Sequence, residues 1–418
     1  MKTVQDLLDM PHAHDVAERL IRYAKIETTS SRSHEAIPSS ESQWKLAKLL
    51  VEELTALGVH DVTLDDHCFV IAKIPASPGY ENKPAVGFMA HIDTVADVSG
   101  ANVNPRIVTD YDGGVITLSN KRTIDPNEFP ELLSYKHDSL IVTDGTTLLG
   151  ADDKAGVAAI MSAVKLIIND SSIKHGPLYA IFTPDEETGR GMNAFPLDKV
   201  PMKACYTFDG GPAGEIEAEC FNAYGVQVQF TGKPSHPGYA RGVMANAASM
   251  AAHFASLLPR SESPEATDGW YGYYYILEIH GELEHAELQL LLRDFSDEGM
   301  QRRLEALQHF AHVIEAQFPE GKVHIEAKEQ YKNMKHKLLE APQALEFLEQ
   351  AMRNAGIEPQ YKPIRGGTDG ARLTQMGIPT PNIFAGMHNF HSQLEWASVA
   401  EMTLAVDVIL ELVKLWAQ

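Results

Sequence analysis

The chain has 418 residues, of which 44% are hydrophobic and 22% are charged, and its formal net charge is −22. This length exceeds what one ordinary hydrophobic core covers, so we expect two domains. The acidic excess argues against nucleic acid or an anionic membrane surface as a partner, and it favours a soluble cytoplasmic protein. We expect neither a membrane span nor a signal peptide, because no uncharged apolar run approaches about 18 residues and acids occupy the first segment. Three scattered cysteines predict buried thiols in a reducing compartment.

The first half of the chain predicts helices that alternate with buried strands. Apolar residues at helical spacing predict helices over 12–30 and 40–57, the second ending at Gly58, and a further helix that begins just after Asp152-Asp153. Short and almost wholly apolar runs are typical of strands buried on both faces. These runs are 85–90, 178–183 and 204–208. The alternation predicts an α/β fold with a mixed, mostly parallel sheet and helices on both faces.

The pattern of apolar residues changes near residue 214, and the buried α/β pattern resumes near residue 330. Alternating apolar residues predict strands at 224–230 and 288–295, and helical spacing predicts helices at 243–258 and 297–317. We therefore expect an inserted α+β domain over 214–329. The flanking segments 1–213 and 330–418, which close with a helix at 397–416, would form one catalytic, metal-binding domain.

Polar side chains follow the predicted buried strands where each strand ends. His91 and Asp93 follow the first, Glu186-Glu187 follow the second and Asp209 follows the third. Sites in α/β sheets gather beyond the carboxyl ends of the strands, so we expect these side chains to meet. Together with Asp152 and a histidine near residue 390, they offer the ligand set of a two-zinc hydrolase and one spare carboxylate to act as a base.

Each of these residues also has an ordinary structural explanation. Asp152 and its neighbour can simply cap a helix, since aspartate suits a helix N-terminus. Glu186-Glu187 can be a solvated loop tip, and Asp209 before two glycines can be a turn residue. His388 and His391 lie so close in sequence that spacing alone does not choose between them.

The motifs as a set resemble those of the di-zinc exopeptidases, the family that includes glutamate carboxypeptidase and succinyl-diaminopimelate desuccinylase. Within that family they resemble the tripeptide aminopeptidases, and the likeness runs from about residue 20 to 415. The motifs that carry it are His91-x-Asp93, Gly-Ala-Asp152-Asp-Lys-Ala-Gly, Pro-Asp-Glu186-Glu187-x-Gly, Asp209-Gly-Gly, His236-Pro-Gly-x-Ala-x-Gly-x-Met-x-Asn246-Ala, Arg365-Gly-Gly-Thr-Asp-Gly and Asn-Phe-His391.

This resemblance implies a role for each residue of the metal site. Asp152 would be shared by two zinc ions, with a cis peptide bond after it. His91 and Asp209 would hold one ion, and Glu187 and His391 would hold the other. Asp93 would orient His91, and Glu186 would be the general base. Co²⁺ or Mn²⁺ could substitute for zinc in a site of carboxylates and imidazoles.

The resemblance also implies residues that bind the substrate. His236, in the inserted lid and dimerisation domain, would cross a homodimer interface and stabilise the oxyanion in the partner's site. Asn246, Arg293 and the loop Arg365, Gly366, Gly367 and Thr368 resemble positions that contact substrate. The arginines suit a peptide carboxylate, and a structural ion pair is an equal alternative for them. Asp153 and Asp97 are candidates for binding the free amine.

The expected activity is release of the N-terminal residue from tripeptides by metal-activated water. A metallo-carboxypeptidase or an N-acyl-amino-acid deacylase would use the same metal core, so the core does not separate these alternatives. A non-catalytic binding protein on this fold is a more remote alternative, because a structural site needs no unligated base such as Glu186.

Overall fold

A computed structural model describes residues 2–418, which divide into two compact units. Unit 1 comprises the chain up to Ala218 together with His336–Lys362 and Thr368–Gln418. Unit 2 comprises Glu219–Lys335 and the short segment Pro363–Gly367.

Unit 1 contains a mixed eight-stranded sheet with the strand order β1-β2-β8-β3-β9-β16-β10-β15. The parallel pairs lie at its centre, where β3 pairs with both β8 and β9, and β9 pairs with β16. The outer pairs β1–β2, β2–β8 and β10–β16 are antiparallel. The strands are β1 (Asp61–Leu64), β2 (Val70–Ile74), β3 (Val86–His91), β8 (Leu178–Thr183), β9 (Ala204–Gly210), β10 (Glu215–Cys220), β15 (Gln360–Ile364) and β16 (Asn382–Phe384).

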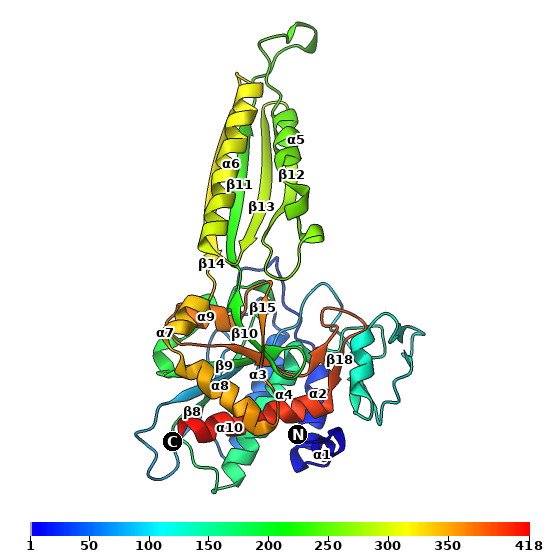
Figure 1. The fold of residues 1–418 in the computed structure, drawn as a ribbon, viewed down its shortest axis with the longest axis vertical. Helices are drawn as coiled ribbons and strands as arrows, with labels where there is room; N and C mark the ends of the chain where they lie inside the picture. Colours follow the sequence, from blue (N-terminus) through cyan, green and yellow to red (C-terminus); the bar gives the residue numbers. More distant parts are fainter. Residues whose placement is uncertain (1) are drawn as a thin grey trace. The chain divides into compact units, whose positions relative to one another are not determined.

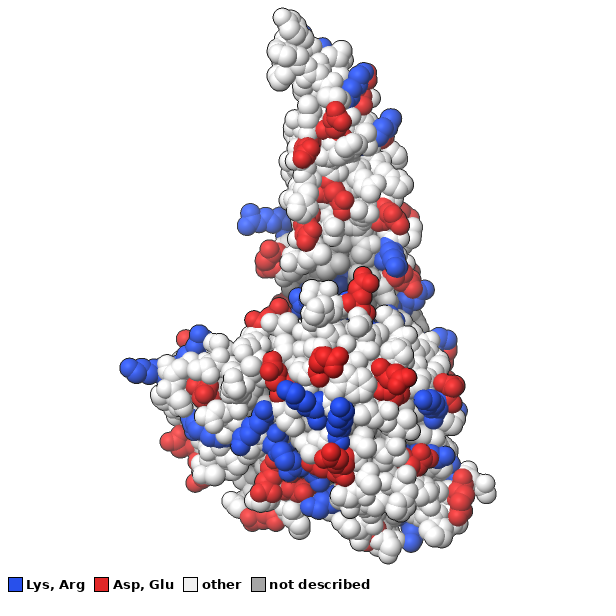
Figure 2. Space-filling view, turned by 180° about the vertical axis from the view of Figure 1, so that it is seen from behind, with Lys and Arg blue, Asp and Glu red and all other residues white. Residues whose placement is uncertain are grey.

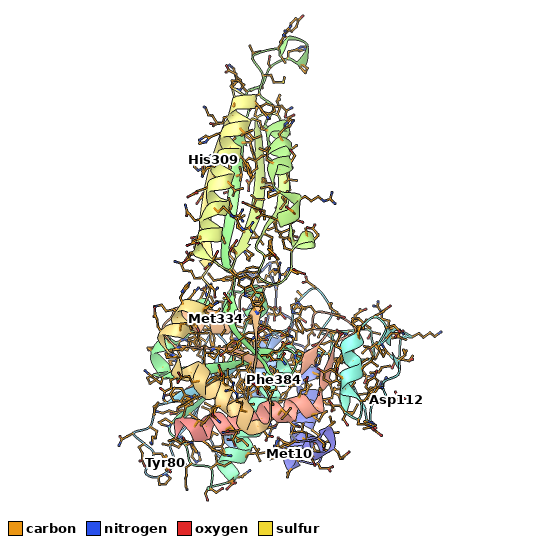
Figure 3. The ribbon with its side chains drawn as sticks, in the orientation of Figure 1. Met10, Tyr80, Asp112, His309, Met334 and Phe384 are labelled. Atoms are coloured by element: carbon orange, nitrogen blue, oxygen red, sulfur yellow. The ribbon has the colours of Figure 1, made fainter. Side chains whose placement is uncertain are left out.

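Helices cover this sheet because its central strands are apolar on both faces. On one face Phe88 of β3 packs beside Tyr206 and Phe208 of β9, under helix α4. On the other face Met89 and Ile181 belong to a cluster that extends to Leu373 of α9. Figure 1 shows α2, α4, α8 and α10 grouped on unit 1, and Figure 3 places Phe384 of β16 in its interior, where it is fully buried. The helices of unit 1 are α1 (Val4–Leu8), α2 (Pro11–Ala24), α3 (Gln43–Ala56), α4 (Ala151–Asn169), α7 (Lys335–Glu340), α8 (Gln343–Ala355), α9 (Asp369–Gln375) and α10 (Val399–Trp416).

Two smaller sheets complete unit 1. One has the order β17-β18-β7-β4 and the other is the pair β5-β6. The strand β7 pairs antiparallel with β18, and their side chains enclose a cluster around Trp396. These strands are β4 (Arg106–Val108), β5 (Ile116–Thr117), β6 (Thr123–Ile124), β7 (Leu140–Val142), β17 (Met387–His388) and β18 (Trp396–Ser398).

Unit 2 is a four-stranded antiparallel sheet, in the order β12-β13-β11-β14, with two helices packed on one face. Alternate residues of β13 are buried, which is the pattern of a strand with one covered face. Figure 1 shows α6 running alongside β11 and β13 within this unit, and Figure 3 labels His309 on that helix. Its elements are β11 (Asn222–Thr231), α5 (Ala247–Leu257), β12 (Tyr273–Gly281), β13 (His285–Asp294), α6 (Asp297–Gln317) and β14 (Lys322–Tyr331).

The structure differs from the sequence prediction in the length of the first helix. The prediction extended it to residue 30, but α2 ends at Ala24. Thr29 instead forms a parallel bridge with Thr94, and the Ser30 N–H donates to the Thr94 carbonyl, so this segment is extended beside the end of β3.

The unit boundaries also differ from the predicted 214 and 329. Ile216 of β10 pairs with Ile383 in the large sheet, which keeps 214–218 in unit 1. At the other end β14 continues to Tyr331 and pairs there with Ala223, so unit 2 extends beyond 329. The segment 363–367, predicted to lie in the catalytic domain, groups with unit 2.

On the face drawn in Figure 2, acidic and basic side chains are interspersed, so the negative charge there is not gathered into one patch. Among residues 2–418 no helix has the length and apolar character needed to cross a bilayer.

Candidate metal centre

His91 occupies the last position of β3, and its imidazole is almost fully buried. Its Nε2 lies 2.9 Å from Asp152 Oδ1 and 3.6 Å from Asp209 Oδ1. Its Nδ1 lies 3.0 Å from the backbone oxygen of Asp93 and 3.4 Å from the Asp93 carboxylate. The ring is therefore fixed on its Nδ1 side by Asp93 and presents Nε2 to the cluster, as expected for a metal-binding histidine.

Asp152 and Asp153 lie in the first turn of α4, after the glycine-containing turn that ends β7, and a cis peptide bond joins them. The two oxygens of Asp152 face different histidines, since Oδ1 is 2.9 Å from His91 Nε2 and Oδ2 is 3.1 Å from His391 Nε2. Asp153 is fully buried, and its oxygens accept the N–H groups of His91 and Gly156. Asp152 thus has the geometry of a ligand shared by two cations. Asp153 instead accepts hydrogen bonds from the end of β3 and from the first turn of α4.

A sharp turn after β8 carries Glu186 and Glu187. Asp185 has a positive φ of 58°, and its carboxylate accepts hydrogen bonds from Ser39 and Gln43. The Asp93 carboxylate accepts the backbone N–H groups of Glu186 at 2.9 Å and Glu187 at 3.3 Å. Asp93 therefore orients the turn with both glutamates as well as the ring of His91.

The two glutamates of this turn are placed differently. Glu187 Oε1 lies 2.9 Å from His391 Nε2. The Glu186 carboxylate makes no hydrogen bond or ion pair with residues 2–418. Glu186 is therefore the carboxylate that this site leaves free.

Asp209 is near the end of β9, where the pairing with β16 is irregular. The side-chain amide of Asn382 bridges this irregularity, because its Oδ1 accepts the Asp209 N–H at 3.2 Å and its Nδ2 donates to the Asp209 carbonyl at 3.1 Å. Glu217 accepts a hydrogen bond from the same amide. Asn382 thus fixes the backbone that carries Asp209.

The structure distinguishes His391 from His388. His391 Nε2 lies within 3.1 Å of both Asp152 and Glu187, and its backbone has a φ of 58°, an uncommon conformation for a residue with a side chain. His388 points elsewhere, because its ring stacks on Trp396 at 3.9 Å and its Nε2 bonds to Glu401. Only His391 joins the cluster.

Electrostatics show that the cluster carries more negative charge than its surroundings stabilise. Burial raises the pKa of Asp209 to about 7, although His91 opposes the shift. Burial, followed by the negative charge of Asp209, raises the pKa of Glu186 well above its ordinary value. Hydrogen bonds that the His391 imidazole donates to Asp152 and Glu187 raise the pKa of His391 to about 10. Carboxylates packed in this way favour the approach of positive charge.

The residues fit a pair of divalent cations. Two overlapping sets of side chains have ligand atoms within 4.8 Å of one another, namely His91, Asp153 and Asp209, and His91, Asp152 and Glu187. Of the two aspartates, Asp152 has carboxylate oxygens without backbone partners, whereas backbone N–H groups already occupy both oxygens of Asp153. The buried Glu187 Oε1 faces His391 Nε2 at 2.9 Å and meets no other donor among the described residues, as expected for a ligand atom. Carboxylate oxygen and imidazole nitrogen are ligands of zinc, and also of cobalt and manganese.

Sequence reasoning missed Asn382 and Glu395, which support this centre through backbone hydrogen bonds. Glu395 is fully buried and accepts hydrogen bonds from the turn that precedes Asp152. The only signal for Glu395 in the sequence was an acidic residue four positions after His391, and Asn382 lies within an apolar run that gave none.

His236 and Asn246 lie in unit 2, on the connection from β11 to α5. His236 is exposed, with its Nδ1 accepting the Gly238 N–H and its ring 5.4 Å from that of Tyr239. Asn246 is the N-cap of α5, and its Oδ1 accepts the Ser249 N–H. The side chain of Asn246 thus has a structural role within its own unit.

The two arginines expected to bind substrate are also engaged inside unit 2. Arg293 donates to the Leu292 carbonyl and lies over the Tyr331 ring. Arg365 donates to the carbonyls of Thr267, Gly269 and Tyr271, and it lies over the rings of Phe221 and Tyr273. Neither arginine forms an ion pair with a carboxylate among residues 2–418. The structural role of each arginine consists instead of hydrogen bonds to backbone carbonyls and contacts with aromatic rings.

The loop beside Arg365 divides between the two units. Gly366 is open, with no atom within 4 Å of a Cβ built on it, whereas a Cβ on Gly367 would meet Tyr331 at 2.9 Å. Thr368 belongs to unit 1, is buried and caps α9 by accepting the Ala371 N–H.

The fold and this cluster define a metal-dependent peptide hydrolase of the zinc-exopeptidase type. Residues 144–415 match the model of peptidase family M20/M25/M40, and the chain belongs to that family.

Its relatives place it more narrowly. It is 45% identical over 406 residues to a peptidase T of Geobacillus kaustophilus, covering 97% of this chain and 98% of that protein. It is 43% identical over 402 residues to the peptidase T of Bacillus subtilis, covering 96% and 98%. Among solved structures it resembles aminopeptidase PepT from Bacillus cereus, with a TM-score of 0.76, 22% identity and coverage of 97% and 99%. It also resembles a dinuclear metal-binding M20 peptidase of Bacillus subtilis, with a TM-score of 0.65, 16% identity and coverage of 96% and 97%.

Proposed function

We propose that this chain is a cytoplasmic aminopeptidase that removes the N-terminal residue from tripeptides with the help of two divalent metal ions, zinc in the first instance. The observation that carries the proposal is the arrangement of Asp152, whose Oδ1 faces His91 and whose Oδ2 faces His391. Full-length similarity to proteins named peptidase T supports the choice of reaction.

The side chains around Asp152 divide into two sets. His91 and Asp209 would hold one cation, Glu187 and His391 would hold the other, and Asp152 would contact both. Two bound divalent cations would supply Lewis acidity, which lowers the pKa of water towards about 7 and polarises a peptide carbonyl.

Glu186 would move the proton in this reaction. It lies beside the metal ligands, yet its carboxylate makes no bond with the described residues, so it is available to water. It would accept a proton from the attacking water and deliver one to the nitrogen of the departing peptide. Asp93 would keep it in place, because the Asp93 carboxylate binds the Glu186 N–H at 2.9 Å.

We also propose that the chain forms a homodimer through unit 2. The strand β12 lies at the edge of its sheet, and Tyr275, Leu277 and Ile279 on it are 40%, 47% and 49% exposed. An apolar edge strand of this length favours pairing with another chain. The exposed His236 would then be supplied to a second copy, where it would donate to the developing oxyanion.

Substrate contacts in this proposal are Asn246, Arg293 and the loop from Arg365 to Thr368. Their side chains have partners within the chain, so any contact with substrate would be additional to these structural roles. Gly366 is the exception, since the space beside it is open.

The proposal is tested with a free tripeptide and its N-acetylated form, each with and without a chelator. We expect release of the first residue from the free tripeptide only, and loss of that release with the chelator. Release of the last residue would instead show a carboxypeptidase, and cleavage of the acetyl group would show a deacylase. Either result would refute the aminopeptidase assignment.

A further inference from the structure

Glu395 is a buried carboxylate outside the set of metal ligands. It is 1% exposed, and it accepts three backbone hydrogen bonds. Its Oε2 accepts the N–H groups of Leu149 at 2.6 Å and Gly150 at 2.8 Å, and its Oε1 accepts the Asp152 N–H at 3.0 Å. Both oxygens are therefore used to hold one short turn, the turn that carries Asp152.

The turn needs such a partner because its own conformation leaves these N–H groups unpaired. Gly150 has a φ of 76°, and Asp152 has non-helical dihedral angles at the start of α4. The first N–H groups of a helix have no acceptor within the helix, and an unpaired N–H in a buried place costs about 1–3 kcal/mol. A carboxylate at this end of α4 is also favoured by the helix dipole.

Glu395 comes from the segment that carries another ligand. It lies just before β18, in the loop that contains His391. The hydrogen bonds of Glu395 therefore join the His391 loop directly to the Asp152 turn. These two segments are far apart in sequence, yet His391 Nε2 must remain 3.1 Å from Asp152 Oδ2.

We propose that Glu395 is a positioning residue that fixes Asp152 between the two cations by bonding the backbone of its turn. The inference rests on the proposed function, since it assigns Asp152 to the metals. Glu395 does not itself face a cation, because its two oxygens are occupied by the three N–H groups. Glu395 acts on metal binding indirectly, because it fixes the direction in which the Asp152 carboxylate points.

The test is Co²⁺ binding to the full chain carrying Glu395→Gln. The amide keeps the shape of the side chain but replaces one accepting oxygen with an NH₂ group, which faces N–H donors and repels them. Loss of such a supporting bond typically weakens metal affinity about 10- to 100-fold. We expect a loss of that size in a Co²⁺ titration, together with a changed visible absorption spectrum of the bound Co²⁺.

Asp138→Asn is the matched control. Asp138 is 1% exposed and accepts the N–H groups of Ser139 and Ala400 and the hydroxyl of Ser398, at the junction of β18 and α10, where none of the proposed metal ligands lies. Both variants should lose thermal stability, and only Glu395→Gln should lose Co²⁺ affinity. An unchanged Co²⁺ affinity in Glu395→Gln, or an equal loss in Asp138→Asn, would overturn the inference.

A second variant covers the case in which Glu395→Gln does not fold. Glu395→Asp keeps the negative charge in place but shortens the side chain, so its oxygens reach fewer of the three N–H groups. We expect the same direction of change in Co²⁺ affinity, and unchanged affinity would contradict the inference. Failure of the unmodified chain to bind Co²⁺ would instead refute the proposed function, and this inference with it.

Discussion

Replacing Glu186 with glutamine separates the roles of the two adjacent glutamates. The substitution keeps the size of the side chain and removes its ability to accept a proton. General-base catalysis by a positioned side chain contributes about 10²- to 10⁴-fold, so kcat should fall by that factor, equivalent to about 3–5 kcal/mol in the activation barrier. Metal content should not change, because the Glu186 carboxylate makes no hydrogen bond or ion pair with any of the ligands.

The structure also predicts the effect of Glu186→Gln on stability. Burial and neighbouring negative charges raise the pKa of Glu186 well above its ordinary value in the metal-free chain. An acid with a raised pKa in the folded state destabilises that state once the pH exceeds the ordinary pKa. In chelator-treated protein at pH 7, Glu186→Gln should therefore raise the melting temperature above that of the unsubstituted chain. The increase should be smaller at pH 4.

The control is Glu187→Gln, which changes the residue that lies 2.9 Å from His391. It should lose metal as well as activity. Measured kcat and metal content for both variants decide the matter. Near-normal kcat in Glu186→Gln, or loss of metal from it, would refute the assignment of Glu186 as the free base.

Three further predictions concern other parts of the chain. His391→Ala should lose bound metal, whereas His388→Ala should keep the metal and lower the melting temperature, because His388 contacts Trp396 and Glu401 instead. Elemental analysis of the two variants measures this difference. Metal loss from His388→Ala would contradict the ligand set. Burial would raise the pKa of Asp15, but hydrogen bonds from Lys165 and other donors lower it to about 2, so Asp15 stabilises the fold above pH 4 and loses this effect as the pH falls towards 2. Asp15→Asn should thus lower stability by about 1–2 kcal/mol at pH 7 and by less at pH 3, which denaturant unfolding measures, and a constant difference would contradict this. Ile279→Glu should convert a dimer to a 46.0 kDa species in sedimentation, and an unchanged dimer would exclude β12 from the interface.

The sequence predicted the central strands well because their signal is local. The run that forms β8 is almost wholly apolar, and the observed bounds Leu178–Thr183 equal the predicted ones. The edge strands β12 and β14 were not predicted, since they carry many exposed residues and lack a regular alternation of buried and exposed positions. Edge strands are specified by the neighbour they pair with rather than by their own pattern.

The same reasoning explains what was found of the site. The polar residues at strand ends follow from the sheet, because β3, β8 and β9 are parallel neighbours whose carboxyl ends meet. The choice of His391 over His388 depends on which ring stacks on Trp396, and spacing in the sequence does not contain that information. The bonds of Glu395 and Asn382 to distant backbone groups exist only in the folded chain.

The central claim is that side chains at or just after the carboxyl ends of β3, β8 and β9, together with Asp152 and His391, bind a pair of divalent ions. Elemental analysis of active protein after gel filtration tests it most directly. We predict two equivalents of metal per 46.0 kDa chain, falling by at least one equivalent in Asp152→Ala. Full activity in protein with no bound metal, or an unchanged metal content in Asp152→Ala, would contradict the account.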